Sequence, residues 1–127
     1  MRRVVETDAA PRSIGPYSQA IEAAGLVFCA GQIGLDPATG TLVAGGAAAE
    51  AERAIHNLEA VLAAVGLGLR DIAKTTLFLT SLADGPAVGV VYGRLLAVPY
   101  PARSTVEVAA LPAGARVEIE AIAVRRG

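Results

Sequence analysis

The sequence predicts an α+β fold, in which two helices pack on one face of a mixed β-sheet in a single domain over residues 1–127. The expected elements follow the order strands, helix, strand, helix and strands. No repeat, low-complexity tract or linker divides them. A hydrophobic fraction of 54% with only 18% charged residues indicates one packed core and argues against disorder.

The first third of the chain is predicted to contain short strands separated by turns. Proline and glycine make residues 9–16 irregular. The turn Asp36-Pro37-Ala38-Thr39-Gly40 closes a small hairpin, because proline presets φ and glycine accepts positive φ. The predicted strands are 2–5, 17–23 and 26–30, with 33–35 and 41–43 in the hairpin.

The clearest helix is predicted over residues 47–65. Its apolar residues recur at i, i+3, i+7 and i+10, which is typical of a helix with one buried face. Gly66 follows at the position where a residue of positive φ commonly ends a helix, and Leu67 supplies the accompanying hydrophobic contact. The residues of the apolar stripe are Ile55, Leu58, Leu62 and Val65.

The second half of the chain is predicted to be strand, helix and two strands. Residues 74–80 form the strand, and residues 85–97 form a weaker helix that contains Gly89 and Gly93 and ends before Pro99. Residues 103–108 and 117–124 are rich in β-branched side chains and form the two closing strands.

These closing strands contain the candidate catalytic and substrate-binding residues. Arg103, Thr105 and Glu107 share one face of the first strand, because side chains alternate along a strand. Glu118 and Glu120 share one face of the second, together with Ile122 and Val124. We expect the two strands to be neighbours with these faces on the same side, away from the helices. A guanidinium suits a carboxylate and a glutamate can activate water, which indicates a small anionic substrate attacked by water.

Composition excludes several classes of function. The net charge of −1, the dispersed basic residues and the aromatic fraction of 4% do not indicate a nucleic-acid surface. No apolar run approaches the ~20 residues of a membrane span, and no signal-peptide core follows Arg2 and Arg3. One cysteine and one histidine indicate neither a disulfide nor a usual zinc site. We expect a cytoplasmic protein with no metal and with neither membrane nor nucleic acid as a partner.

The sheet face away from the helices predicts assembly. We expect it to carry apolar side chains beside the charged ones, and such a surface is poorly suited to full exposure. A second copy of the same chain is the simplest cover, so the sequence predicts a homo-oligomer with sites near the subunit boundary.

Five sequence blocks, in this order, resemble the Rid/YjgF family of reactive intermediate deaminases, nearest its RidA-type branch. They span nearly the whole chain. The blocks are Ile14-Gly15-Pro16-Tyr17-Ser18-Gln19, Ala30-Gly31-Gln32-Ile33, Lys74-Thr75-Thr76-Leu77-Phe78-Leu79, Pro101-Ala102-Arg103-Ser104 and Val117-Glu118-Ile119-Glu120-Ala121-Ile122-Ala123.

The resemblance implies a chorismate-mutase-like α+β fold that assembles as a homotrimer, with three sites in the clefts between subunits. It also implies hydrolysis of enamines and imines, such as 2-aminoacrylate and its imine tautomer, to 2-oxo acids and ammonium. An imine carbon is already electrophilic, so this reaction demands neither a metal nor a covalent nucleophile, and no cofactor is expected.

By position, the resemblance makes Arg103 the arginine that binds the substrate carboxylate and Glu118 the glutamate that activates water. Tyr17 matches the family's pocket tyrosine and Gly31 its backbone-contact glycine. Thr105 lies on the face of Arg103, where its main chain can contact substrate. Three positions depart from the commonest RidA-type pattern and remove polar contacts, and they are Ala30, Thr105 and Gly89.

Simpler structural roles stand beside these assignments. Arg103 could form an ion pair with Glu107, Glu118 or Glu120 of a neighbouring chain, and spacing leaves Glu120 open as the base, although a structural ion pair is its simpler role. Tyr17 could be an aromatic anchor at a subunit boundary, and Gly31 a turn residue. Cys29 is expected to be an inert buried thiol, His56 a helix-surface residue and Lys74 a solvated strand end.

Three other functions compete with hydrolysis. A non-catalytic trimer that binds small carboxylates would fit the lost polar contacts at Ala30 and Gly89. Cleavage of RNA is disfavoured by the neutral charge and the scarcity of aromatics. Chorismate mutase activity is suggested by fold alone, and fold does not determine function.

Overall fold

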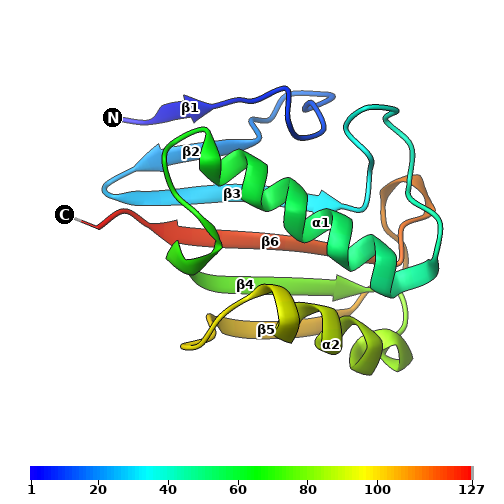
Figure 1. The fold of residues 1–127 in the computed structure, drawn as a ribbon. Helices are drawn as coiled ribbons and strands as arrows, with labels where there is room; N and C mark the ends of the chain where they lie inside the picture. Colours follow the sequence, from blue (N-terminus) through cyan, green and yellow to red (C-terminus); the bar gives the residue numbers. More distant parts are fainter. Residues whose placement is uncertain (127) are drawn as a thin grey trace.

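A six-stranded mixed sheet with two helices on one of its faces forms the protein (Figure 1). The computed structural model describes residues 1–126. The sheet has the strand order β1-β2-β3-β6-β4-β5, and every neighbouring pair is antiparallel except β4 and β5. The predicted α+β fold is confirmed. The strands are β1 Arg3–Val5, β2 Ala20–Ala23, β3 Leu26–Ile33, β4 Ile72–Leu79, β5 Ala102–Glu107 and β6 Val117–Val124, and the helices are α1 Gly46–Ala63 and α2 Gly85–Leu95.

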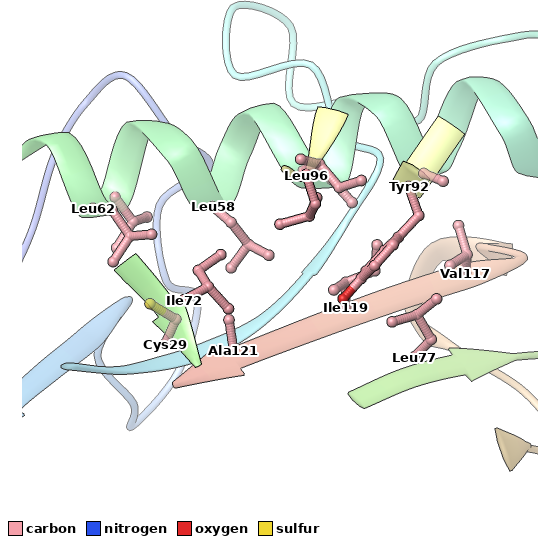
Figure 2. Close-up of a cluster of buried hydrophobic side chains, with 14 of the residues drawn as sticks. Cys29, Leu58, Leu62, Ile72, Leu77, Tyr92, Leu96, Val117, Ile119 and Ala121 are labelled. Carbon is pink, nitrogen blue, oxygen red and sulfur yellow. The ribbon is translucent and has the colours of Figure 1, made fainter. Parts of the chain in front are cut away.

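The core lies between the helices and the central strands. Alternate residues of β6 point inward and are almost fully buried, including Val117, Ile119 and Ala121. Figure 2 shows Leu58 and Leu62 reaching from α1 toward this layer. Truncating such a leucine to alanine typically costs about 2–5 kcal/mol, so this layer fixes the position of the sheet under the helices.

The end of α1 follows the predicted pattern. Gly66 has φ of 75°, and the Leu67 N–H donates to the Leu62 carbonyl at 3.0 Å. The helix itself ends at Ala63, two residues before the predicted Val65, because the last turn tightens to hydrogen bonds between residues three apart.

The strands near the N-terminus differ from the predicted ranges. Residues 17–19 are outside β2, because the Gln19 side chain holds the preceding loop through the carbonyls of Thr7, Ala10 and Pro11. Strand β3 continues three residues past Ala30 and ends at Ile33. The hairpin predicted from residues 33–35 and 41–43 is reduced to one isolated bridge between residues 35 and 42.

The predicted adjacency of the two closing strands is wrong, because β4 lies between β5 and β6. The α2 crossover places β5 parallel to β4 at the outer edge of the sheet. All six residues of β5 are exposed, whereas β6 has a row of apolar side chains that α1 covers. The polar strand therefore takes the edge and the apolar strand takes the centre.

The sheet face opposite the helices, here called the open face, is uncovered (Figure 1). Phe28, Val106 and Val124 lie on it with exposed fractions of 43%, 42% and 40%. The apolar character predicted for this face is therefore present, and assembly through it stays a prediction. Within the part of the chain that is described, neither helix has the length and hydropathy needed to span a membrane.

Candidate functional site

Glu118 lies on the open face of β6 and folds over Gly31 of β3. A bulge shifts the register between β3 and β6 from Cys29 to Gln32, and Gly31 lies within it. A Cβ atom at Gly31 would be 2.7 Å from the Glu118 Cδ and 2.9 Å from its Cγ, and would overlap the carboxylate. The absence of a side chain at Gly31 is therefore what makes room for the Glu118 carboxylate.

The Glu118 carboxyl is half-buried, and it makes no hydrogen bond or ion pair with any group in residues 1–126. Burial, and then the nearby charge of Glu120, raises its pKa above the ordinary value. A carboxyl without a partner and with a raised pKa is suited to taking up and releasing a proton.

Arg103 lies on the opposite side of the sheet, at the β5 edge. Its guanidinium carbon is 5.0 Å from the centroid of the Tyr92 ring. Across residues 1–126, the Arg103 side chain has no carboxylate partner, so its donors are available to a ligand. A cavity of about 450 Å³ adjoins it, lined by Gly89, Tyr92, Gly93, Tyr100, Pro101 and Arg103.

The predicted shared face of Arg103 and Glu118 is wrong within one chain. Arg103 pairs with Thr75, which is buried under the helices, whereas Glu118 pairs with Phe78 on the open face. The two α-carbons are separated by two strand spacings and three residues, roughly 14 Å. The alternation within each strand is as predicted, but the partners of Arg103 and Glu118 on β4 are three residues apart, so the two side chains point to opposite sides of the sheet.

Thr105 and Glu120 each stay with the expected neighbour. Thr105 lies beside Leu77 on the helix side of β5, on the same face as Arg103. Glu120 lies beside Thr76 on the open face, two residues from Glu118. One chain thus presents two half-sites, which we call the glutamate half-site (Gly31 and Glu118) and the arginine half-site (Arg103 and Thr105).

Tyr17 lies in the loop before β2 and is 54% exposed. Its N–H donates to the Gly15 carbonyl at 2.9 Å, and its side chain lines a surface cavity of about 540 Å³. Two residues later, the Gln19 carbonyl accepts the Ala30 N–H at 2.9 Å. The loop that carries Tyr17 therefore ends against the strand segment of the glutamate half-site.

Cys29 and His56 have the structural roles predicted for them, whereas Lys74 lies inside β4 and not at its end. Cys29 is buried, and burial raises its thiol pKa to about 12, so it is not a ready nucleophile. His56 lies on the surface of α1 near Glu52 and Glu59. The Lys74 Nζ donates to the Ser104 Oγ at 3.1 Å across the open face.

Sequence reasoning missed Tyr92 and Tyr100, which line the arginine half-site. Tyr92 occupies a buried position of α2 beside Val88 and Val91. A hydroxyl within such an apolar stripe needs a hydrogen-bond partner, and this signal could have marked the residue as more than core.

Comparison with known proteins agrees with this fold. A family model described as endoribonuclease L-PSP matches residues 7–125. Protein DfrA of Myxococcus xanthus is 51% identical over 97% of this chain and 95% of its own length. The human 2-iminobutanoate/2-iminopropanoate deaminase is 43% identical over 98% of this chain and 91% of its own length.

A solved structure of E. coli TdcF with bound serine has a TM-score of 0.92 and 40% identity, and the match covers 98% of this chain and 99% of TdcF. The family match spans nearly all of the described residues, and the relatives match over almost their full length. The chain belongs to the YjgF/Rid family.

Proposed function

We propose that this protein hydrolyses reactive enamine and imine intermediates, of the 2-aminoacrylate and 2-iminopropanoate type, to 2-oxo acids and ammonium. The observation that carries the proposal is the half-buried, unpartnered Glu118 carboxyl, whose pKa is raised and which lies over Gly31. The relatives named 2-iminobutanoate/2-iminopropanoate deaminase, and the serine found in TdcF, support a small amino-acid-like substrate.

In the proposed reaction, the substrate carboxylate binds the Arg103 guanidinium and one water molecule attacks the imine carbon. The Glu118 carboxylate accepts a proton from that water as the C–O bond forms. It returns this proton to nitrogen, which gives a carbinolamine. The Glu118 carboxylate then takes the proton of the carbinolamine hydroxyl and passes it to nitrogen, the C=O bond forms as the C–N bond breaks, and the nitrogen leaves as ammonia, which takes up a proton from solvent to become ammonium. Water and imine thus give a 2-oxo acid and ammonium with no redox change.

Because one chain holds Arg103 and Glu118 on opposite sides of its sheet, we propose that each site combines two chains. The arginine half-site of one subunit meets the glutamate half-site of the next. The exposed β5 edge and the uncovered open face are the surfaces that would meet in such an assembly. A homotrimer would contain three sites of this kind.

A coupled assay tests the reaction. A serine or threonine dehydratase supplies the enamine, and the release of 2-oxo acid is followed with and without this protein. We expect acceleration by the wild-type protein and its loss in Arg103→Ala and Glu118→Ala. Absence of acceleration, with pyruvate still raising the thermal unfolding temperature, would instead favour a non-catalytic trimer that binds small carboxylates.

A mixing experiment tests the shared site. Arg103→Ala and Glu118→Ala chains, each inactive alone, are co-expressed in equal amounts. If Arg103 and Glu118 come from different chains, random assembly leaves about one site in four with both residues intact, and about a quarter of the wild-type activity returns. If one chain supplied both residues, no site would be restored, so an inactive mixture would contradict the arrangement.

A further inference from the structure

Tyr92 lies under the arginine half-site and has no part in the proposed proton transfers. Its ring comes from α2 and is buried, with 4% of the residue exposed. Figure 2 shows the ring pointing from the helix toward the sheet. The Arg103 guanidinium lies over this ring, with its central carbon 5.0 Å from the ring centroid.

A hydrogen bond fixes the ring from its far end. The Tyr92 hydroxyl is 2.8 Å from the Thr75 Oγ1, and Thr75 is 2% exposed. Thr75 is also the residue of β4 that lies directly beside Arg103 of β5. Thr75 of β4 therefore holds the Tyr92 ring, and the ring in turn contacts the face of the Arg103 guanidinium.

The geometry matters for how a guanidinium binds a carboxylate. The five N–H donors of Arg point outward in the plane of the group, along its edges. A ring below the guanidinium attracts the cation without using any of these donors. Arg103 has no carboxylate partner within residues 1–126, so the ring contact limits its motion while its edges stay free. Without the ring, an exposed arginine on an edge strand would sample many rotamers.

We infer that Tyr92 is a positioning residue for substrate binding: its ring, held by Thr75, orients the Arg103 guanidinium for two-pronged recognition of a monocarboxylate. The inference rests on the proposed function, because it takes Arg103 as the carboxylate anchor. The inference concerns binding, and it assigns Tyr92 no contact with the reacting carbon or nitrogen.

The test uses pyruvate, the 2-oxo acid product of the proposed reaction, in calorimetric titrations of the assembled protein. We expect Tyr92→Leu to weaken pyruvate binding about tenfold, since a cation over a buried ring contributes to that extent. Tyr92→Phe keeps the ring, and it should restore binding to within about threefold of wild type. Thr75→Val removes the same hydrogen bond from the other side, and it should match Tyr92→Phe.

The Arg103→Lys background separates positioning from general damage. Lysine keeps the charge but lacks the planar guanidinium, so the Tyr92 ring has no planar group to orient in this background. There, Tyr92→Leu should change pyruvate affinity by less than about twofold. An equal loss in both backgrounds, or no loss in either, would overturn the inference.

Controls keep the outcome interpretable. Each variant is checked by thermal unfolding, and if Tyr92→Leu does not fold, Tyr92→Met, which also removes the ring, takes its place in the cycle with Arg103→Lys. In kinetic assays, Tyr92→Leu should raise KM and leave kcat within about threefold, because the Glu118 chemistry is untouched. If the wild-type protein does not hydrolyse the imine but its pyruvate binding depends on Arg103 and Tyr92, the proposed reaction alone is refuted. Intact hydrolysis with pyruvate binding that is insensitive to Tyr92 would refute the positioning role alone.

Discussion

The Glu118 carboxyl has the environment expected of a group that exchanges protons. Glu120 is two residues away on the same face of β6, and its charge adds to the effect of burial on the Glu118 pKa. Of the two carboxyls, only Glu118 lies over Gly31. Position thus favours Glu118 as the base, although spacing in the sequence left Glu120 open.

Replacing Glu118 tests this assignment. Glu118→Gln should lower kcat by about 10²–10⁴-fold, the range typical of a lost general acid–base group. In the wild type, the rate should fall as pH drops through the raised pKa of Glu118, because the protonated carboxyl cannot accept a proton from water. The measurement is 2-oxo acid release over a pH series.

Glu120→Gln is the matched control. It should keep the neutral-pH rate within a few-fold, and it should move the acidic limb to lower pH, since removing a like charge lowers the pKa of Glu118. If Glu120→Gln lost as much activity as Glu118→Gln, Glu120 would be the base.

Gly31 gives a second test at the residue scale. Gly31→Ala places a methyl group where the Glu118 carboxylate lies, and the flexible side chain can move away while the strand stays in place. We expect a folded protein with a loss of activity close to that of Glu118→Gln. Gly85→Ala is the control, because its Cβ would meet no atom within 4 Å. Full activity in Gly31→Ala would show that the position of the carboxylate is unimportant.

Among the elements, β5 is a strand whose exposure calls for an explanation. An edge strand with all six residues exposed normally carries charges or bulges that prevent pairing. This strand carries Arg103 and Glu107, but it also presents the apolar Val106 on the open face, beside Phe78. Its apolar residue at an uncovered edge is consistent with a partner subunit in the assembled protein.

A charge on this strand tests the predicted homotrimer. Val106→Asp should shift the protein from trimer to smaller species in analytical ultracentrifugation and abolish hydrolysis, because the proposed site needs two chains. Val90→Asp is matched in chemistry and lies on α2, where Val90 is 73% exposed, and it should change neither property. A trimeric Val106→Asp protein would exclude this strand from the interface.

At the scale of the whole molecule, one ionic cluster joins both ends of the chain to the sheet. Glu22 of β2 receives the Arg3 Nη2 at 2.7 Å and the Arg125 Nε at 2.6 Å, and Arg125 also donates to the Val65 carbonyl. These hydrogen bonds, first to Arg125 and then to Arg3, lower the pKa of Glu22 from 4.5 to about 2.

The lowered pKa of Glu22 predicts a pH-dependent share of stability. Its contribution is present above pH 4.5, the ordinary pKa, and is lost as pH falls toward about 2. Glu22→Gln should therefore unfold at a lower temperature than wild type at pH 7, with a difference that shrinks below pH 4.5. Asp8→Asn, which breaks the exposed pair with Arg12, should have little effect at any pH. A difference for Glu22→Gln that is constant with pH would contradict the assignment.

The sequence by itself determined the features that depend on neighbours along the chain. Side-chain alternation predicted that Arg103 shares a face with Thr105 and that Glu118 shares a face with Glu120, and both predictions are confirmed. Helical periodicity and Gly66 located α1 to within two residues. These features are local, because the side-chain direction and the helix stop follow from a few consecutive residues.

Only the tertiary structure decided which strands are neighbours. The α2 crossover and the burial of the apolar β6 under α1 put β4 between the two closing strands. The register of each strand with β4 then sets Arg103 and Glu118 on opposite sides of the sheet. Strand order depends on long-range packing, because several strands have an apolar face that the same two helices could cover. No short segment of the sequence determines which strands become neighbours. The contacts of Gly31 with Glu118 and of Tyr92 with Arg103 arise from the same packing.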